Sequence, residues 1–531
     1  MKVKPSKSRS ISIIKGKLKE IRFFIDKEPI PTISEKPVKS LGRLYDAKLK
    51  DTCMAVELRK TVNEGLASID ETSLPGKLKL WCLQYGLMPR LCWPLTIYDI
   101  SLSNVERMER AISARIRKWL GVPPSLTNVA LYGRGLFELP LSSLTEEYKC
   151  SKVRRQMILI DSKDEMIQAV APSQKTGKKW HSKTATEQAI AAAKHKDIVG
   201  YVQCGKSGLG MGEKRERWGK SSTVERRRMV VNEVHHQEEQ MRCARAVSQA
   251  KQGQWMKWEG LEKRKISWKE LWDMEAGRIS FLVRSIYDVL PTPTNLHQWL
   301  EKDPACPLCD TPATLRHILT ACKVSLSQHR YTWRHNKVLR SLAAIIDIKR
   351  NTHNAQPHNQ RGTKPMISFV REGQKPPSRP MNIRAGVLQS ANDWLLLVDL
   401  DNMLKIPAEI AVSTLRPDML LYSVNIRKVL LIELTVPWED AISEAYERKK
   451  FKYMELAAEM RANGWDADVY PVEISCRGFI AGSTVTLLRR LGLSGKALRH
   501  ATKNLSSVAE YSSRWIWLMR GEKKWEQKGS G

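Results

Sequence analysis

The alternation of hydrophobic and polar positions predicts a pair of strands in the last quarter of the chain. Residues 419–423 and 428–433 are mainly apolar, and a polar turn around Asn425 separates them. Asp418 directly precedes the first strand, and Glu433 ends the second. An unpaired charge at the end of a buried strand costs on the order of several kcal/mol, so the Glu433 carboxylate needs a partner.

A helix is predicted after this hairpin. Residues 439–463 carry apolar positions at helical spacing, interleaved with charged positions that include Lys449 and Lys450. A lysine one or two turns into this helix can face the strand ends. A later strand, over residues 468–474, offers Glu473 as a further carboxylate, to which we give little weight.

Helices also dominate the pattern in the first half of the chain. Residues 78–85 and 104–120 have helical spacing, and Pro123 and Pro124 are expected to end the second helix. Residues 175–183 and 213–228 have the composition of basic, polar linkers, and residues 229–252 continue as a charged helix.

Four tryptophans in the middle of the chain alternate with basic side chains. Such a stripe is more often part of a core, although it can also stack bases beside a cationic track. The tryptophans are Trp255, Trp258, Trp268 and Trp272. The basic run Arg226-Arg227-Arg228 can contact phosphates or act as a nuclear-entry signal, and the alternative is a solvated helix face.

Composition narrows the class of partner. The chain has 531 residues, 42% of them hydrophobic, which is enough for several domains with real cores. The net charge of +33 favours binding to a polyanion, so nucleic acid is the expected partner. No apolar run reaches the roughly eighteen residues of a transmembrane helix, so no membrane partner is expected. The ten cysteines show no disulfide framework, which indicates a reducing compartment.

The carboxylate pair, followed by lysines, suggests a metal-dependent nuclease. Lys449 and Lys450 follow Glu433 by sixteen and seventeen residues. Two carboxylates close together, such as Asp418 and Glu433, repel unless a cation lies between them, and Mg²⁺ prefers oxygen ligands. Such an ion can polarise a phosphate and activate water, while a lysine stabilises the developing charge. The alternative is an edge hairpin with solvated carboxylates and an exposed lysine-rich helix.

A second pattern predicts a structural zinc site. The spacing is Cys-x2-Cys-x7-His-x4-Cys, formed by Cys306, Cys309, His317 and Cys322. Two cysteines on a tight turn and a His/Cys pair about one helical turn apart can close a tetrahedral Zn²⁺ site with no open position. His329 and His335 are alternative ligands that fit the spacing less well.

Together these motifs resemble the C-terminal half of site-specific non-LTR retrotransposon polyproteins. The resemblance rests on the zinc spacing, on Arg334-His335-Asn336, and on the order Arg-Pro-Asp, Glu-Leu-Thr and Lys-Lys-Phe-Lys-Tyr. In that family a reverse transcriptase with a thumb precedes a CCHC zinc knuckle and a PD-(D/E)xK restriction-like endonuclease. Residues 41–46 resemble the end of the palm, and residues 75–120 resemble the thumb.

The resemblance implies roles for particular residues. It makes Asp418 and Glu433 the magnesium carboxylates, and it makes Cys306, Cys309, His317 and Cys322 the zinc ligands. The catalytic lysine would come from the helix after the strands, as Lys449, Lys450 or Lys452, with the first two favoured. No Tyr-x-Asp-Asp occurs in the sequence, so polymerisation by this chain alone is not expected.

We therefore expect a multidomain α and α/β protein with a helical thumb-like region, a small zinc knuckle and a restriction-like α/β endonuclease domain. The expected activity is Mg²⁺-dependent nicking of target DNA in the nucleus, with element RNA as a further partner. The alternatives are an inert element remnant that only binds nucleic acid, and a fragment of a full reverse transcriptase. The expected segments are a basic N-terminal tail (1–34), the palm end and thumb-like region (35–160), a basic linker and charged helix (161–260), a helical linker with the knuckle (261–345), a disordered linker (346–381), the endonuclease (382–512) and a basic tail (513–531).

Overall fold

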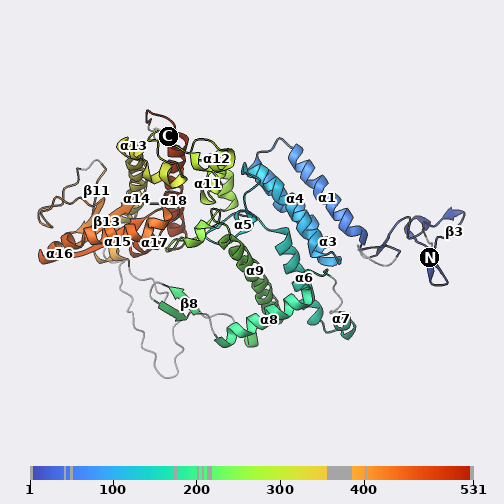
Figure 1. Cartoon of the computed structure of the whole chain (residues 1–531). Coiled ribbons are helices and arrows are strands. Elements are labelled where there is room, and N and C mark those ends of the chain that lie inside the picture. Colours follow the sequence, from blue (N-terminus) through green and yellow to red (C-terminus); the bar gives the residue numbers. More distant parts are fainter. Residues whose placement is uncertain are drawn as a thin grey trace, which may run out of the picture. The chain divides into compact units, whose positions relative to one another are not determined.

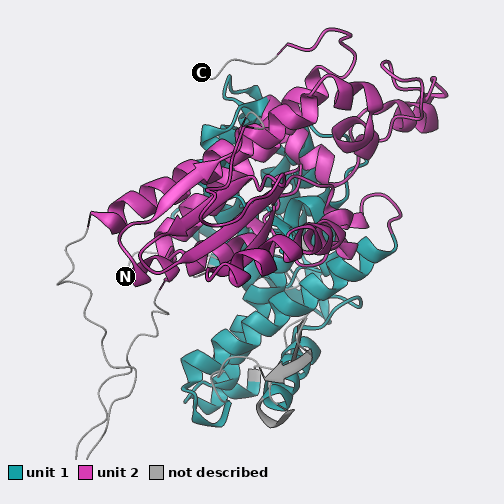
Figure 2. Cartoon of the chain, turned by 90° about the vertical axis from the view of Figure 1, so that its left-hand side faces the viewer, with its two compact units in different colours: residues 1–248, 265–276 teal, residues 249–264, 277–531 magenta. Residues whose placement is uncertain are grey.

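The computed structural model contains two compact units, which Figure 2 distinguishes by colour. Unit 1 comprises residues 1–248 and 265–276, and unit 2 comprises residues 249–264 and 277–531. The structure describes residues 4–40, 43–47, 52–170, 176–199, 202–205, 208–211, 218–355, 386–400 and 403–526. Parts of the expected palm end, at 41–42, and most of the expected linker, at 356–381, therefore lie outside the described residues. Within the described ranges, no helix is long and apolar enough to cross a lipid bilayer.

Unit 1 is mainly helical, with short two-stranded sheets (Figure 1). Its helices are α1 (Thr52–Glu71), α2 (Gly76–Cys82), α3 (Met88–Ile97), α4 (Leu102–Leu120), α5 (Asn128–Tyr132), α6 (Leu144–Ile160), α7 (Glu165–Val170), α8 (Ser182–Val199), α9 (Thr223–Val247) and α10 (Trp268–Asp273), and a π-helical turn, η2 (Leu83–Leu87), joins α2 to α3. The paired strands are β1 (Ser12–Ile14) with β2 (Lys17–Lys19), β3 (Phe24–Ile25) with β4 (Glu28–Pro29), β5 (Val38–Ser40) with β6 (Arg43–Tyr45), and β8 (Val202–Gly205) with β9 (Gly208–Met211).

The helices expected in unit 1 are present, with shifted ends. The helix predicted over 104–120 is α4, and Gly121 ends it in a left-handed conformation with φ 65° before the prolines are reached. The charged helix predicted from residue 229 is α9, which begins six residues earlier. Its start is a capping box, in which Ser222 and Glu225 satisfy each other's backbone N–H groups. The run Arg226-Arg227-Arg228 therefore lies on a helix and not in the linker expected there.

Unit 2 is built around a four-stranded sheet in the order β11-β12-β13-β14. β11 (Leu395–Val398), β12 (Met419–Ser423) and β13 (Lys428–Thr435) are antiparallel neighbours, while β14 (Asp466–Glu473) runs parallel to β13. The predicted hairpin and the predicted later strand are thus confirmed. Helices α15 (Ile442–Lys452) and α16 (Met454–Ala462) form the crossover from β13 to β14. One helix was expected over 439–463, but the α-helix is interrupted at Tyr453.

Both faces of this sheet are buried. Leu430, Ile432 and Leu434 of β13 belong to one core, together with residues of α14 (Arg330–Asn354), α17 (Gly482–Arg490) and α18 (Gly495–Leu518). Val429 and Leu431 belong to a second core on the opposite face, together with residues of α16. A strand buried on both faces is apolar at almost every position, which explains the continuous run in the sequence.

The remaining helices of unit 2 surround the cysteine-rich segment. They are α11 (Ala276–Ile286), α12 (Pro293–Leu300), the π-helical turn η6 (His317–Ala321) and α13 (Lys323–Ser327). A basic tail was expected from residue 513, but α18 continues to Leu518, and its Ile516 and Trp517 are buried. These two apolar side chains belong to the core around the zinc-spacing cysteines, so the chain stays folded there.

Candidate functional site

The two predicted carboxylates lie on the same face of the sheet, at the same end of adjacent strands. Met419 of β12 pairs with Ile432 of β13, so Asp418 and Glu433 stand one step further along this ladder. Side chains alternate between the faces of a strand, and Glu433 therefore shares the face of Val429 and Leu431. The crossover helices cover this face, and α15 supplies the lysines.

Each carboxylate accepts a hydrogen bond from the backbone of the other strand. The backbone N–H of Asp418 donates to Glu433 Oε2 at 3.0 Å, and the N–H of Leu434 donates to Asp418 Oδ2 at 2.7 Å. These reciprocal bonds fix both side chains relative to the strand ends. The carboxylate positions are thus set by the hairpin itself.

Of the lysines considered from the sequence, the structure brings Lys449 to Glu433. The Lys449 ammonium donates a hydrogen bond to Glu433 Oε1 and forms an ion pair with it. Lys450 is exposed, and its ammonium lies 5.7 Å from the centre of the Tyr446 ring. The preference for Lys450 alongside Lys449 is therefore not supported by the geometry, because adjacent residues on a helix point about 100° apart.

Lys452 approaches the same region through Tyr453. Lys452 Nζ donates to the Tyr453 hydroxyl at 3.0 Å, and that hydroxyl donates to the backbone carbonyl of Arg416 at 2.8 Å. Tyr453 is fully buried, and burial together with the negative charge of Glu433 raises the pKa of its hydroxyl. Tyr453 thus stays a neutral donor, tying the break between α15 and α16 to the segment before Asp418.

Burial and like charge both act on Glu433. Only 3% of the residue is exposed, and this burial raises the pKa of its carboxyl group. The charge of Asp418 raises the pKa further, while Lys449 lowers it, and the net shift is upward. Burial and the charge of Asp418 therefore disfavour the charged form of Glu433, and a cation bound between the two carboxylates would favour it.

His335 joins the site from α14. Its Nε2 lies 3.3 Å from Asp418 Oδ2 and 3.2 Å from the backbone carbonyl oxygen of Leu434. Burial lowers the pKa of His335, but the hydrogen bond and charge of Asp418 outweigh burial and raise it overall. We considered His335 as a weaker zinc ligand from the sequence, but it lies at the carboxylates instead. His335 and Asp418 are more than eighty residues apart, so no local sequence pattern predicts this contact.

The carboxylates open into a cavity of about 460 Å³. The basic side chains of Arg416 and Lys452 line it, together with His335, Asn336 and Asp399. The cavity has the volume of a small-ligand site, and positive charge beside the carboxylates suits a phosphate group. Asp399 lies in a turn, where its Oδ1 accepts the backbone N–H groups of Met403 and Leu404 at 2.9 and 3.2 Å.

Glu473 lies at the end of the neighbouring strand β14, and it is 1% exposed. Its Oε2 accepts a hydrogen bond from the Ser483 hydroxyl. Glu473 is absent from the lining of the cavity among the described residues.

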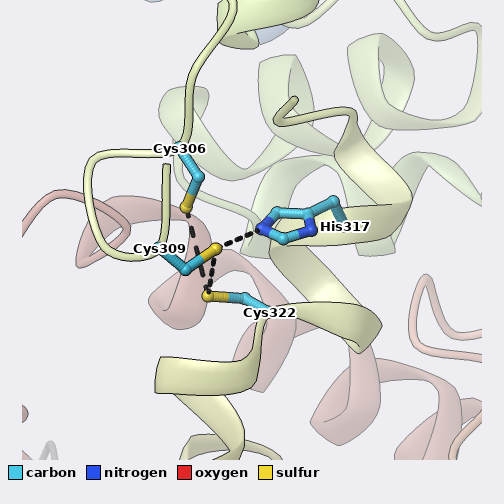
Figure 3. Close-up of side chains that lie close together, drawn as sticks. All are labelled: Cys306, Cys309, His317 and Cys322. Carbon is cyan, nitrogen blue, oxygen red and sulfur yellow. Dashed lines mark hydrogen bonds between the residues drawn. The ribbon is translucent and has the colours of Figure 1, made fainter. Parts of the chain in front are cut away.

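The four predicted zinc ligands converge on one point (Figure 3). The ligand atoms of Cys306, Cys309, His317 and Cys322 all lie within 4.8 Å of one another. Cys309 and Cys322 have their sulfurs 3.7 Å apart, and Cys306 and Cys322 have theirs 4.0 Å apart. A disulfide requires about 2.05 Å. With Zn–S bonds of about 2.3 Å, a tetrahedral site separates its sulfurs by about 3.8 Å.

The fourth ligand of this cluster is the imidazole nitrogen of His317. His317 Nε2 lies 3.2 Å from Cys309 Sγ, and burial lowers the pKa of His317, which favours the neutral imidazole that binds metals. Three sulfurs and one nitrogen at these separations could hold a structural zinc ion. His329 instead takes the left-handed conformation, with φ 57°, that begins α14.

The cysteine cluster and the carboxylate site are connected through α14. This helix starts eight residues after Cys322 and carries His335 at its second turn. Arg334 is 2% exposed, and its guanidinium donates to the carbonyl of Leu319 at 2.9 Å and to Ser513 Oγ at 3.0 Å. The cluster thereby helps to set the position of His335 against Asp418.

The tryptophan stripe divides into two groups. Trp255 and Trp258 are buried, as the core interpretation predicted, and Trp258 lies edge-on to Phe479. Trp272 is 41% exposed and Trp268 is half-buried, so this second pair remains at the surface of unit 1.

No protein-family model matches the chain, and a comparison with curated proteins found no match. The family resemblance therefore rests on the motifs alone.

Proposed function

We propose that this protein is a retrotransposon-derived, metal-dependent DNA endonuclease that nicks a target site. The observation that carries the proposal is the meeting of Asp418, Glu433 and Lys449 at one end and on one face of two adjacent strands. The PD-(D/E)xK restriction-like endonuclease of the retrotransposon family that the sequence resembles also needs two carboxylates followed by a lysine, on a mixed sheet with a helical crossover. Target DNA, element RNA and a nuclear location follow as parts of the same proposal.

The donor set suits magnesium. Asp418 and Glu433 offer hard carboxylate oxygens, which Mg²⁺ prefers, and both residues line the same cavity. These two residues would hold the ion. When bound, Mg²⁺ polarises the phosphate and makes water more acidic.

The chain's own side chains have separate tasks in this proposal. Lys449 places a positive charge at Glu433, where it can stabilise charge on the phosphate or orient the attacking water. Arg416 and Lys452 line the cavity and can bind a neighbouring phosphate of the DNA strand. His335 holds Asp418 and can exchange a proton at its Nε2.

A second candidate is a nucleic-acid-binding remnant without cleavage. A specific observation favours it: Glu433 is already paired with Lys449, and Asp418 already faces His335, so neither carboxylate depends on an ion. The net charge of +33 would serve this function equally well. The third candidate, a fragment of a full reverse transcriptase, predicts coding sequence for adjacent aspartates upstream in the same frame.

Nicking of supercoiled plasmid tests the first candidate against the second. We expect relaxed product with Mg²⁺ and none with EDTA, at low salt. Asp418→Asn and Glu433→Gln keep the side-chain shapes and should each reduce nicking by at least about 100-fold. Glu447→Gln is the matched control, because Glu447 is an exposed carboxylate on α15.

The outcomes separate the candidates. DNA binding without Mg²⁺-dependent nicking would reject the endonuclease and leave the binding remnant. Nicking that survives in both carboxylate variants would place the activity elsewhere or in a contaminant. Unchanged thermal unfolding of the variants ensures that a loss of nicking reflects chemistry and not folding.

A further inference from the structure

Four aromatic side chains of unit 1 form a closed circuit of ring contacts. Trp81 contacts Tyr85 with ring centres 5.5 Å apart, and Tyr85 contacts Trp268 at 5.6 Å. Trp268 contacts Trp272 at 6.5 Å, and Trp272 returns to Trp81 at 6.5 Å. We call these four residues the aromatic platform. Two come from the α2–η2 segment and two from α10, so residues distant in the sequence share one surface.

Three of the four rings of the platform are exposed. Trp81, Tyr85 and Trp272 are 42%, 53% and 41% exposed, whereas the buried Trp255 and Trp258 are 7% and 8% exposed. Each exposed ring leaves on the order of 100 Å² outside. Together they make an apolar patch of about 300 Å², which is the size at which surface patches are often functional.

The structure beneath holds these rings in place. Leu80 directly precedes Trp81, Leu83 lies between Trp81 and Tyr85, and both leucines are buried, which anchors that segment to unit 1. Lys77 ties the other half to it, because its ammonium donates to the backbone carbonyls of Trp272 and, at 2.8 Å, Met274. Rings already ordered lose little conformational entropy when a flat ligand stacks on them.

Charge indicates what kind of flat ligand fits. Residues 76–98, which carry Trp81 and Tyr85, contain Lys77, Lys79 and Arg90 and no acidic side chain, while residues 265–276, which carry Trp268 and Trp272, contain two basic and three acidic side chains, so the two segments together are net positive. The whole chain has a net charge of +33. Aromatic rings beside cationic groups are typical of sites where unpaired bases stack while the backbone phosphates meet positive charge. A wholly apolar protein partner would not need this bias.

We propose that the aromatic platform binds single-stranded nucleic acid by stacking unpaired bases on Trp81, Tyr85 and Trp272. The inference does not depend on the proposed cleavage, because it concerns a different unit and needs no metal. Bases of DNA and RNA offer the same ring faces, so the chemistry is shared by both. Duplex bases are already stacked on one another and cannot use the platform.

Fluorescence anisotropy with labelled oligonucleotides tests the proposal on the full chain without added Mg²⁺. The probes are a twenty-nucleotide oligo-dT, an oligo-U of the same length and a blunt-ended DNA duplex. Trp81→Ala combined with Trp272→Ala should weaken binding of the single strands by at least about tenfold. Binding of the duplex should change by less than about twofold, because phosphate contacts are kept. The tighter of the two single strands then identifies DNA or RNA as the preferred ligand.

Two further variants separate stacking from folding. Trp81→Phe combined with Trp272→Phe keeps a ring at each position and should restore most of the single-strand affinity. Trp299→Ala is the matched control, since Trp299 is 46% exposed but lies on α12 in unit 2. The proposal is overturned if the alanine pair binds single strands like the wild type, if it loses duplex affinity equally, or if Trp299→Ala causes the same loss.

Discussion

At the scale of single residues, two adjacent lysines of α15 provide a direct test of the carboxylate site. Lys449 pairs with Glu433, whereas Lys450 is exposed beside Tyr446. Lys449→Ala should reduce Mg²⁺-dependent nicking by about 10²- to 10³-fold, because a preorganised positive charge at the phosphate would be lost. Lys450→Ala removes the same charge from the same helix and should change nicking by less than about twofold.

Initial nicking rates at saturating Mg²⁺ are the measurement for this pair. Equal losses in the two variants would indicate that these lysines act only through general attraction for DNA. Repeating the rates at higher salt checks this point, because general attraction weakens with salt while a buried contact does not.

A buried glutamate of unit 1 predicts how stability depends on pH. Glu146 is 2% exposed and pairs with His235 and Arg242 of α9 and, at 3.0 Å, with Arg134. Burial opposes its charge, but the His235 hydrogen bond and the charge of Arg242 outweigh burial, and the pKa of Glu146 falls from 4.5 to about 2. The charged form is therefore favoured in the folded state.

The sign of this effect follows from the lowered pKa. The stabilisation is complete above the unfolded pKa near 4.5 and is lost as the pH falls through about 2. Glu146→Gln should lower the free energy of unfolding by about 3 kcal/mol at pH 7, and by progressively less below pH 4.5. Urea unfolding at several pH values measures the difference. Glu187→Gln, at an exposed pair on α8, should cost less than about 0.5 kcal/mol and serves as the control. A difference that grows on acidification would contradict the assignment.

At the scale of secondary-structure elements, the cysteine cluster and α14 should respond together to zinc. The wild type should contain about one zinc per chain, and Cys306→Ser and Cys322→Ser should lose it. Since the cluster packs in the same core as α18, loss of the ion should lower the melting temperature by at least about 5 °C. Elemental analysis and thermal unfolding measure the two effects.

Cys243→Ser is the control for the zinc prediction, because Cys243 lies in unit 1 and outside the cluster. It should keep the full zinc content. If Cys306→Ser and Cys322→Ser also keep one zinc per chain, the ion does not bind where we place it.

The sequence predicted elements best where a single local pattern decides them. The β12–β13 hairpin follows from continuous apolar runs, which a strand buried on both faces requires. The start of α9 could have been placed correctly from the Ser222 and Glu225 capping box, which is visible in the sequence. The end of α18 was misjudged because basic residues suggested a tail, although Ile516 and Trp517 are apolar and buried.

Features that depend on distant residues were beyond prediction. The break at Tyr453 is stabilised by a hydrogen bond to the carbonyl of Arg416, which no local pattern reveals. The choice between Lys449 and Lys450 depends on the rotation of α15 against the sheet. His335 meets Asp418 only because α14 packs on the sheet that carries it. The cysteine cluster could be predicted, because the spacing of its four residues in the sequence is typical of zinc sites.

At the scale of the whole molecule, charge dominates the expected behaviour. We expect a net charge of +33 over 531 residues to produce an attraction for nucleic acid that does not depend on its base sequence. Phosphates neutralised by lysine and arginine release counterions, so the affinity falls with salt in proportion to the number of contacts. In our proposals, the aromatic platform and the carboxylate site would add interactions that salt weakens less, because stacking and buried hydrogen bonds involve little counterion release.

The salt dependence of DNA binding therefore carries the last prediction. If at least about six phosphates are contacted, the affinity for duplex DNA should fall by at least about 10³-fold between 50 and 200 mM salt. Anisotropy titrations of a labelled duplex without added Mg²⁺ measure the slope of log affinity against log salt. For single strands, the alanine pair at Trp81 and Trp272 should lower the affinity at every salt concentration without changing this slope, because the rings contact bases and not phosphates. A duplex slope corresponding to fewer than about two contacts would show that the charge serves another purpose, such as solubility, and would remove the electrostatic support for a nucleic-acid partner.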